Sequence, residues 1–585
     1  MLGKIVKIEK NYIFLKREKE ELDDIINLYV KILDKDKIII GEIVGLNEEL
    51  LEIKLVGEIV NDKFIYGVNK KPSVFSKVEL LDKEFIGILF GVKNYTPQTS
   101  LYLGASALYD DVPIFTNINN LFSNHLVVLG NTGSGKSCGV ARILQNLFYQ
   151  KNVSPYNSKF FIIDAYGEYH SAFSMIDAIN KDLSFKSFVT EPNKSNKLLI
   201  PLWLLSLDDI CLLLNVNNKN QIPIVEKALK IVNIFSRKEE LVIKYKNSII
   251  AKAILDIFVN GNTPAQIRDQ IFSVLSRYNT QELNLDTKIF VPGYIRPLRQ
   301  CLMIDDSGKI RETALVIDFL QKFVLEEMNL SLPDGSYKYT LQDLLYAFDF
   351  ALIDEGLFNN DNIFNLANEL RVRLASLIDS EYNVFFDIKN YYTKKEFLDL
   401  ITHNEDKNAQ VINLNLNSLD DRFAKIVAKI YSKMLFDYAK YELERGTEPI
   451  HIILEEAHRY VQNDNDIEIL GYNIFERIAK EGRKYAVLLN LISQRPSELS
   501  QTVLSQCSNF LVFKITHPND IEYIKPMIPF VDDEIIEKIK SLQIGSCLTF
   551  GNAFNLPTII NIKMATPAPS NSSCDISNRW FKTNS

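Results

Sequence analysis

The sequence contains no run of roughly 18 uncharged apolar residues, the length that a membrane-spanning helix requires. Its first residues, MLGKIVKIEKNYIF, carry lysine and glutamate where a secretory signal needs an unbroken apolar segment. We therefore expect a cytoplasmic protein that makes no contact with a membrane.

Cysteine is scarce as well. The 585 residues include 6 cysteines, and no two of them form a C-x-x-C pair. This pattern gives neither a disulfide framework nor a zinc-binding motif. Cys138 follows a lysine and a serine at the start of an expected helix, a position that suits a reduced cytosol.

An excess of positive charge is also missing, because the formal net charge is -8. This balance argues against a surface coated with basic patches, so any contact with nucleic acid has to be local, as in a pore or a groove. The overall charge neither supports nor excludes DNA as a partner.

The chain length predicts several domains. A single hydrophobic core stops growing near roughly 250–300 residues, and this chain has 585. Residues 1–103 contain short apolar runs, such as KIIIGEIVGL, LLEIKLVGEIV and EFIGILFGV, separated by turn residues. Such runs are typical of the strands of a small β-barrel.

Apolar runs followed by helical stretches predict an α/β domain with a parallel sheet. The candidate strands are LVVLG, KFFIIDA, QVINLNL, IHIILEEA, YAVLLNLIS, FLVFKI and SCLTFG. The segment between the second and the third has helical periodicity and is too long for a loop, which predicts an inserted helical subdomain at 171–407. The α/β core then comprises 104–170 and 408–565. The tail, 566–585, is rich in Pro, Ser and Asn, and we expect it to be extended or partly disordered.

The segment GNTGSGKS matches the phosphate-loop pattern G-x-x-x-x-G-K-[ST] and lies between an expected strand and an expected helix. Inward N–H groups and the helix N-terminus bind phosphates in such a loop. Lys136 would bridge the β- and γ-phosphates, and the Ser137 hydroxyl would hold Mg²⁺. The residues predicted to bind ATP are Gly130, Asn131, Thr132, Gly133, Ser134, Gly135, Lys136, Ser137 and Cys138. The loop alone is compatible with kinases, GTPases, transporters and motors.

Two carboxylates follow the buried strand expected at IHIIL, which is the second motif of P-loop NTPases. Glu455 would bind Mg²⁺ through water, and Glu456 would polarise the attacking water. The first acid of this pair is usually Asp, and Glu is one methylene longer. The alternative is a buried strand that ends in two solvated carboxylates.

Further polar residues follow other expected strands. Gln494 comes directly after the strand YAVLLNLIS, where an amide can sense the γ-phosphate or the water. Asp164 ends the strand FIID and Gly167 and Glu168 follow it, where an acid can order the water or the metal shell, and Asp164 is the selected candidate. The segment before the Gln494 strand forms a cationic face with Arg477, Lys480, Arg483 and Lys484, and the alternative is an ordinary solvated helix face.

Four segments in this order, NHLVVLGNTGSGKS, IIDAYGEY, LEEAHRYV and AKEGRKYAVLLNLISQRPSEL, resemble the HerA-type ATPases, which are relatives of the FtsK DNA pumps. The resemblance covers most of the chain. It implies a RecA-like P-loop core behind a HAS-barrel-like domain, a homohexameric ring with ATP sites between neighbours, and sequence-independent binding of DNA in the central channel. It also implies an effector on the barrel, either a nuclease or a sirtuin-type NAD⁺ hydrolase, as in antiviral defence pairs or DNA end processing.

By position, Lys136, Ser137, Asp164, Glu455 and Glu456 match the nucleotide and catalytic positions of that family. Arg483 matches the arginine supplied to the neighbouring site, with Arg477 as the second choice. Two departures stand out. Asn124 precedes His125 where the family often has arginine, and Lys480 replaces an arginine of many relatives.

The first hypothesis is therefore an ATP-driven DNA translocase or helicase that serves as a platform for an effector. An ATP-dependent protein remodeller and an ATP-gated scaffold are the alternatives. DNA-stimulated ATP hydrolysis distinguishes the first from the second, and the polarising carboxylate Glu456 argues against a pure scaffold.

Overall fold

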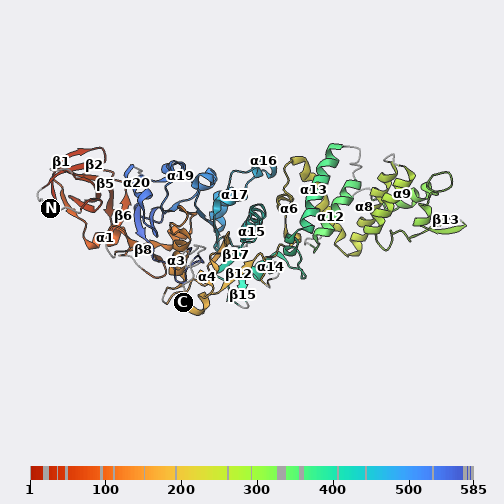
Figure 1. Cartoon of the computed structure of the whole chain (residues 1–585), viewed down its shortest axis with the longest axis horizontal. Helices are drawn as coiled ribbons and strands as arrows, with labels where there is room; N and C mark the ends of the chain where they lie inside the picture. The colour runs from red at the N-terminus through yellow and green to blue at the C-terminus, as the bar shows by residue number, and fades with distance from the viewer. Residues whose placement is uncertain are drawn as a thin grey trace. The chain divides into compact units, whose positions relative to one another are not determined.

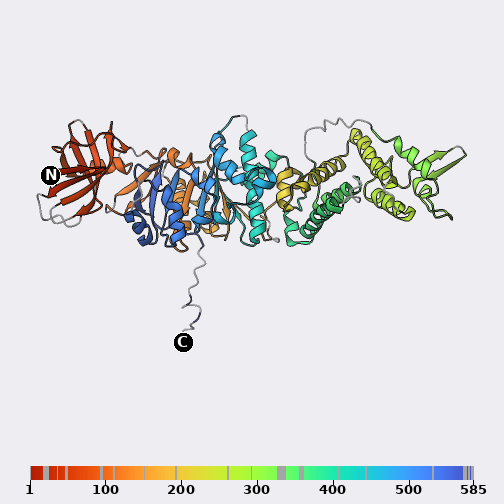
Figure 2. The same ribbon diagram turned by 90° about the horizontal axis from the view of Figure 1, so that it is seen from above.

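The computed structural model (Figures 1 and 2) divides the chain into two compact units. The first comprises Met1–Thr190, Leu400–Asn463 and Ile474–Ser585, and the second comprises Glu191–Asp399 and Asp464–Asn473. The residues described are 2–17, 25–35, 37–46, 50–92, 96–109, 112–150, 152–191, 194, 196–259, 263–291, 293–325, 337–354, 361–404, 407–441, 444–529, 533–570, 576 and 580.

The first unit begins with a seven-stranded antiparallel sheet, whose strands are coloured red and orange in Figure 2. Its order is β1-β2-β5-β4-β3-β7, with β6 paired to β5, and the Leu2 N–H donates to the Val78 carbonyl (2.9 Å), which links the two ends of the sheet. Alternate apolar side chains form its core, as the sequence pattern predicts. The strands are β1 (Gly3–Glu9), β2 (Tyr12–Arg17), β3 (Tyr29–Asp34), β4 (Lys37–Leu46), β5 (Leu50–Val60), β6 (Lys63–Tyr66) and β7 (Lys77–Leu80).

An eleven-stranded sheet forms the rest of the first unit, in the order β12-β17-β11-β18-β19-β10-β20-β21-β22-β8-β9. The pairings from β12 to β20 are parallel, and the pairings from β20 to β9 are antiparallel. The parallel strands are β10 (Leu126–Leu129), β11 (Lys159–Asp164), β12 (Phe185–Val189), β17 (Val411–Asn415), β18 (Ile450–Leu454), β19 (Val487–Ser493) and β20 (Asn509–Val512). The others are β8 (Ser100–Ser106), β9 (Pro113–Asn117), β21 (Ser546–Gly551) and β22 (Thr558–Asn561).

Helices follow the parallel strands, and the central strands are buried along their whole length. All five residues of β18 and all seven of β19 are buried, as expected for a parallel sheet that is covered on both faces. The helices of this unit include α3 (Lys136–Phe148), α15 (Asp421–Tyr441), α17 (Ile474–Glu481) and α20 (Asp533–Ser541). This is the predicted α/β architecture of a P-loop NTPase.

Some expected elements differ. The run EFIGILFGV is not a strand, and its first six residues belong to α1 (Lys83–Leu89). The Asp82 carboxylate caps this helix by accepting from the Phe85 N–H. Residues 100–103, assigned above to the barrel, belong to β8 of the large sheet. The run SCLTFG is β21, which is antiparallel, since a buried apolar run has the same composition in either orientation.

The second unit is mainly helical. Its helices include α6 (Leu207–Leu213), α7 (Ile222–Phe235), α8 (Glu240–Val259), α9 (Pro264–Arg277), α11 (Thr313–Gln321), α12 (Leu341–Asp354), α13 (Asp361–Asp379) and α16 (Asp466–Leu470). Helix α9 starts at a capping box between Thr263 and Gln266, with Pro264 as its first residue. The unit starts at 191 rather than 171, because β12, which lies within the expected insertion, pairs with β17 in the large sheet. Residues 464–473, which lie outside the expected range, also belong to this unit.

A search of the described residues for a helix long and apolar enough to cross a bilayer finds none.

Candidate active site

The phosphate loop lies between β10 and α3, where the sequence predicts it. Gly130, Gly133 and Gly135 have φ values of 155°, 75° and 102°. A Cβ atom on Gly130 would lie 2.6 Å from the Cβ of Phe513, so a larger residue does not fit there. Helix α3 begins at Lys136, directly after the loop, and directs its N-terminus at the space that phosphates would fill.

Lys136 is nearly buried beside this loop. Its Nζ donates to the carbonyl of Asn131 (3.0 Å). Burial lowers the pKa of Lys136, and the carboxylates of Glu456, Glu455 and Glu168 oppose this shift. One lysine therefore faces three acidic side chains, and a divalent cation would offset this excess of negative charge.

Ser137 and Glu455 lie together. The Ser137 hydroxyl donates to Oε1 of Glu455 (3.2 Å), and the Tyr169 hydroxyl donates to Oε2 (2.7 Å). Glu455 is 2% exposed, and burial raises its pKa to about 8. Tyr169 thus fixes one carboxylate oxygen and leaves the other beside Ser137.

Oxygen atoms of a hydroxyl and a carboxylate are ligands that Mg²⁺ accepts, so Ser137 and Glu455 fit this ion chemically. Among the described residues, no group of three or more His, Cys, Asp and Glu side chains could hold a metal by itself. In a site of the P-loop type the protein supplies one or two oxygens, and phosphates and water complete the metal's shell.

Glu456 occupies a backbone conformation that is rare for glutamate, with φ 50° and ψ 49°. It is 7% exposed, and burial raises its pKa while Lys136 lowers it. Nδ1 of His458 lies 3.2 Å from Oε2 of Glu456 and 3.2 Å from the Ser493 hydroxyl. Burial lowers the pKa of His458, so this neighbour is a neutral imidazole. Such backbone strain is typical of functional positions.

Gln494 meets the phosphate loop directly. The Thr132 hydroxyl donates to Oε1 of Gln494, and the backbone of Gln494 hydrogen-bonds the Glu456 carboxylate and lowers its pKa. The end of β19 therefore connects the loop with the predicted polarising carboxylate, which is where a sensor of the γ-phosphate would lie.

Asp164 is fully buried, and its carboxylate faces its own loop. It accepts hydrogen bonds from the backbone N–H groups of Glu168 and Tyr169 (both 3.0 Å) and from the Asn413 amide (3.2 Å). This geometry makes Asp164 an organiser of the turn after β11. Its predicted role in ordering water or metal stays a prediction.

Glu168, the other acid of that turn, lies beside Ser137 and Lys136 of the phosphate loop, whereas the selected candidate, Asp164, does not. Burial raises the pKa of Glu168, and a hydrogen bond with the Ser137 hydroxyl and the charge of Lys136 lower it. Gly167, at φ 73°, makes the turn that brings Glu168 round. The sequence places Glu168 directly after this glycine, at the carboxyl end of β11.

Arg483 lies at the opposite edge of the sheet. It belongs to the short turn Gly482–Tyr485 that precedes β19, whereas the phosphate loop follows β10, and these two strands are parallel neighbours. Arg483 is exposed and lines a cavity with Phe122, Tyr156 and His451. Within one subunit, Arg483 therefore does not reach the phosphate loop.

The other basic residues of this segment have neighbours of their own. The guanidinium of Arg477 lies 5.7 Å from the ring centre of Phe436 and 3.8 Å from the Glu481 carboxylate, and Lys480 lies 3.5 Å from the Glu476 carboxylate. At the start of β10, His125 accepts from the Leu489 N–H (2.9 Å) and contacts the Ala479 carbonyl through Nε2 (3.0 Å). His125 thus joins β10 to α17 and β19.

Residues 566–570, predicted as part of the tail, pack against the site. Gln145 on α3 donates to the Pro567 carbonyl and accepts from the Thr566 N–H (both 2.8 Å), and the Ser570 N–H donates to the Glu168 carbonyl (2.8 Å). This segment joins α3 to the turn of Glu168. Beyond it, only 576 and 580 are within the described part of the chain.

The chain matches a known family model and is similar in sequence to known proteins. The family model described as Helicase HerA, central domain, matches residues 101–435. The chain is 25% identical over 513 residues to a probable DNA double-strand break repair helicase HerA of Methanocaldococcus jannaschii, which covers 87% of this chain and 84% of that protein. It is 20% identical over 530 residues to the DNA double-strand break repair helicase HerA of Pyrococcus furiosus, covering 89% and 79%.

Solved structures that resemble this chain include VirB4 of Thermoanaerobacter pseudethanolicus, at 11% identity and a TM-score of 0.43. The match covers 80% of this chain and 97% of that one. The conjugative coupling protein TrwBΔN70 has 10% identity and a TM-score of 0.42, covering 84% and 94%. The family model matches more than half of the 585 residues. The chain therefore belongs to the HerA helicase family of P-loop ATPases.

Proposed function

We propose that this protein is a ring-forming ATPase that hydrolyses ATP to move along DNA. The observation that carries the proposal is the convergence of Lys136, Ser137, Glu455, Glu456 and Gln494 at one edge of the parallel sheet. The relatives are helicases by name, which supports DNA as the substrate.

Each side chain has a defined task in this proposal. Lys136 neutralises the β- and γ-phosphates, and Ser137 and Glu455 hold Mg²⁺, which supplies charge neutralisation when it is bound. Glu456 accepts a proton from the attacking water, and Gln494 orients that water or the γ-phosphate. Nucleotide binding would separate Lys136 from the Asn131 carbonyl that it contacts here.

The proposed assembly is a homohexamer with ATP between neighbouring subunits. Arg483 supports this, because it lies exposed at the sheet edge opposite the subunit's own loop and is free to approach the loop of a neighbour. An arginine supplied from outside is worth about 10³–10⁵ in rate where it has been measured.

DNA would pass through the central channel and be held through its phosphates rather than its base edges. The formal charge of -8 supports contacts confined to that channel, since the rest of the surface has no excess of positive charge. Binding would then weaken with salt and vary little between unrelated duplexes.

We also propose that the antiparallel sheet of residues 1–80 is the barrel that docks an effector, either a nuclease or a sirtuin-type NAD⁺ hydrolase, in antiviral defence or DNA end processing. Apolar side chains on its surface support a docking role: Phe75 is 90% exposed, and Ile65 and Val74 are 51% and 47% exposed. Co-purification with the product of an adjacent gene, before and after Phe75→Ser, tests this part.

The experiment that tests the proposed activity measures ATP hydrolysis with and without duplex DNA. DNA should stimulate the parent protein, Lys136→Ala should bind ATP poorly, and Glu456→Gln should bind ATP but scarcely hydrolyse it. Stimulation by unfolded protein and not by DNA would favour a protein remodeller instead.

A further inference from the structure

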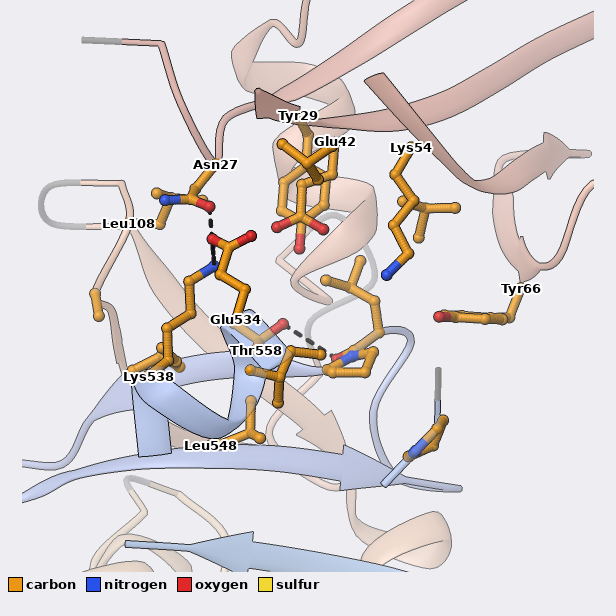
Figure 3. A pocket seen from close by; sticks show the side chains of 18 of the residues that line it. Asn27, Tyr29, Glu42, Lys54, Tyr66, Leu108, Glu534, Lys538, Leu548 and Thr558 are labelled. Atoms are coloured by element: carbon orange, nitrogen blue, oxygen red, sulfur yellow. Dashed lines mark hydrogen bonds and ion pairs between the residues drawn. The ribbon is translucent and has the colours of Figure 1, made fainter. Parts of the chain in front are cut away.

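A cavity lies inside the first unit, between the amino-terminal sheet and the ATPase sheet, and we call it the seam cavity (Figure 3). It encloses about 260 Å³. Its lining includes Tyr29, Glu42, Lys54, Tyr66, Lys538 and Leu548. None of these residues belongs to the ATP site described above.

Strand register places three polar side chains in one row across the roof of the seam cavity. Tyr29 on β3 lies opposite Glu42 on β4, and Glu42 lies opposite Lys54 on β5. Directly opposed residues of antiparallel strands point to the same face. Figure 3 shows the Glu42 carboxylate and the Lys54 ammonium directed into the cavity, with the Tyr66 phenol reaching in from the side.

The floor is apolar and comes from the ATPase domain. It includes Leu548 on β21, Leu556, Ile539 on α20, and Leu542 directly after α20. A surface that combines an apolar floor with a few converging polar groups is typical of small-molecule sites.

The charges of the wall decide which ligands fit. Glu42 and Glu534 are balanced by Lys54 and Lys538, so the lining has no excess charge. Lys538 is already engaged, because its Nζ donates to the Asn27 amide oxygen (2.9 Å) and lies 2.8 Å from the Glu534 carboxylate. A phosphate group would gain little here, and a neutral molecule is favoured.

The volume of the cavity and the polar groups of its roof further restrict the ligands that fit. Pockets for drug-sized ligands begin at roughly 300 Å³, so this cavity fits a smaller molecule. The Glu42 carboxylate is an acceptor beside the Lys54 donor, so the pair complements a planar ligand whose edge carries a donor beside an acceptor. The rings of Tyr29 and Tyr66 offer faces that such a ligand can contact.

The wall of the seam cavity is joined to the phosphate loop by a short path. Helix α20 ends at Ser541, Leu542 lines the cavity, and the Gly545 N–H donates to the Ser134 carbonyl in the phosphate loop (3.1 Å). A Cβ on Gly135 would lie 3.1 Å from the Gly545 nitrogen, so the turn packs closely on the loop. A shift of α20 therefore changes the surroundings of the loop.

We propose that the seam cavity binds a neutral, planar small molecule of nucleobase or nucleoside size, and that α20 transmits its binding to the phosphate loop. The residues that line this site are not among those assigned to the ATP site. The occupancy of the seam cavity can be measured without DNA or a partner, so the failure of either proposal is distinguishable from the failure of the other.

The test is calorimetry of the full chain with adenosine, guanosine and cytidine, under saturating ADP so that no base enters the ATP site. At least one nucleoside should bind with a dissociation constant below 1 mM. Val44→Phe, which places a ring in the cavity, and Lys54→Met, which removes the donor, should each weaken binding at least tenfold. Lys63→Met, on the exposed strand β6, is the matched control and should bind as the parent does.

Absence of binding by all three nucleosides, or equal binding by the parent and both cavity variants, would overturn the proposed site. The link to the loop is tested by ADP affinity with and without the bound nucleoside, which should differ at least twofold. An unchanged ADP affinity would overturn the link. If Val44→Phe instead abolishes capture of a protein partner while no nucleoside binds, the cavity accepts a side chain of that partner and the small-molecule proposal is wrong.

Discussion

The hydroxyl of Thr132 donates a hydrogen bond to Oε1 of Gln494, which joins the phosphate loop to the end of β19. The loop also makes a second contact of this kind, from the Asn131 amide to the Thr516 hydroxyl (2.7 Å). Gln494 follows β19 and Thr516 follows β20, the two strands that pair with β10. Only the first contact involves a residue proposed to sense the γ-phosphate.

Gln494→Ala should lower kcat for ATP hydrolysis at least tenfold with a smaller change in KM, because the amide acts on the γ-phosphate or the water. Thr132→Val should have a weaker effect, since its hydroxyl only positions Gln494. The double variant should be no worse than Gln494→Ala, because both changes remove one interaction. Steady-state kinetics check this, with Thr516→Val as the control; a loss of kcat as large in Thr516→Val would mean that general loop order, and not Gln494, sets the rate.

Substitutions at Asp164 and at Glu168 should affect different properties, the stability of the protein in the first case and its ATP turnover in the second. Asp164→Asn places an amide NH₂ against backbone donors, which should cost about 1–3 kcal/mol of unfolding free energy. Glu168→Gln should leave the unfolding free energy nearly unchanged and lower kcat at least tenfold, because Glu168 lies beside Ser137 and Lys136. Chemical denaturation and ATPase assays measure both. Loss of kcat in a fully stable Asp164→Asn protein would restore the catalytic role first predicted for Asp164.

Stability should fall below neutral pH through two buried histidines. Burial lowers the pKa of His125 to about 4 and that of His451 to about 3, from the usual value near 6.5. Their stabilisation is therefore complete above pH 6.5 and is lost as the pH falls toward 4, by about 1.4 kcal/mol per pH unit for each histidine, because the unfolded chain binds the protons.

His451→Phe should reduce the slope of stability against pH between 6 and 4.5, since His451 stacks on Phe160 (4.6 Å between ring centres) and a phenyl ring keeps this contact without titrating. His517→Gln is the control, because the side chain of His517 is 62% exposed. Denaturation at several pH values gives both slopes. Identical slopes in the parent and His451→Phe would exclude His451 as a source of acid sensitivity.

Local patterns in the sequence point to residues that the structure brings together. The GNTGSGKS segment and the pair Glu455 and Glu456 were identifiable because a strand, a loop and a helix are specified by neighbouring residues, and the structure brings them together with Gln494. The family, the ATPase activity and the α/β class followed from the same segments.

Features that depend on long-range contacts were not predictable. The choice of Asp164 over Glu168 depended on which way a glycine turn directs the two carboxylates. The assignment of β8 depended on pairing with β22, more than 450 residues away along the chain, and β12 depended on pairing with β17. The run EFIGILFGV became part of α1, which is capped at Asp82.

Arg483 should act in the neighbouring subunit's site. Arg483→Ala and Glu456→Gln subunits should each be nearly inactive alone, and mixing them should restore part of the activity at interfaces where an intact Glu456 meets an intact Arg483. Mass spectrometry confirms mixed rings, and Arg477→Ala tests the second choice. No recovery at any ratio in proven mixed rings would contradict a role for Arg483 in the neighbouring site.

The central claim, that ATP hydrolysis drives movement along DNA, is tested most directly by displacement of a third strand from duplex DNA. The parent protein should displace the strand only with ATP and Mg²⁺, and Glu456→Gln should bind the duplex without displacing it. A parent protein that hydrolyses ATP at a DNA-stimulated rate and yet never displaces the strand, on duplexes of any length or end structure, would contradict the account.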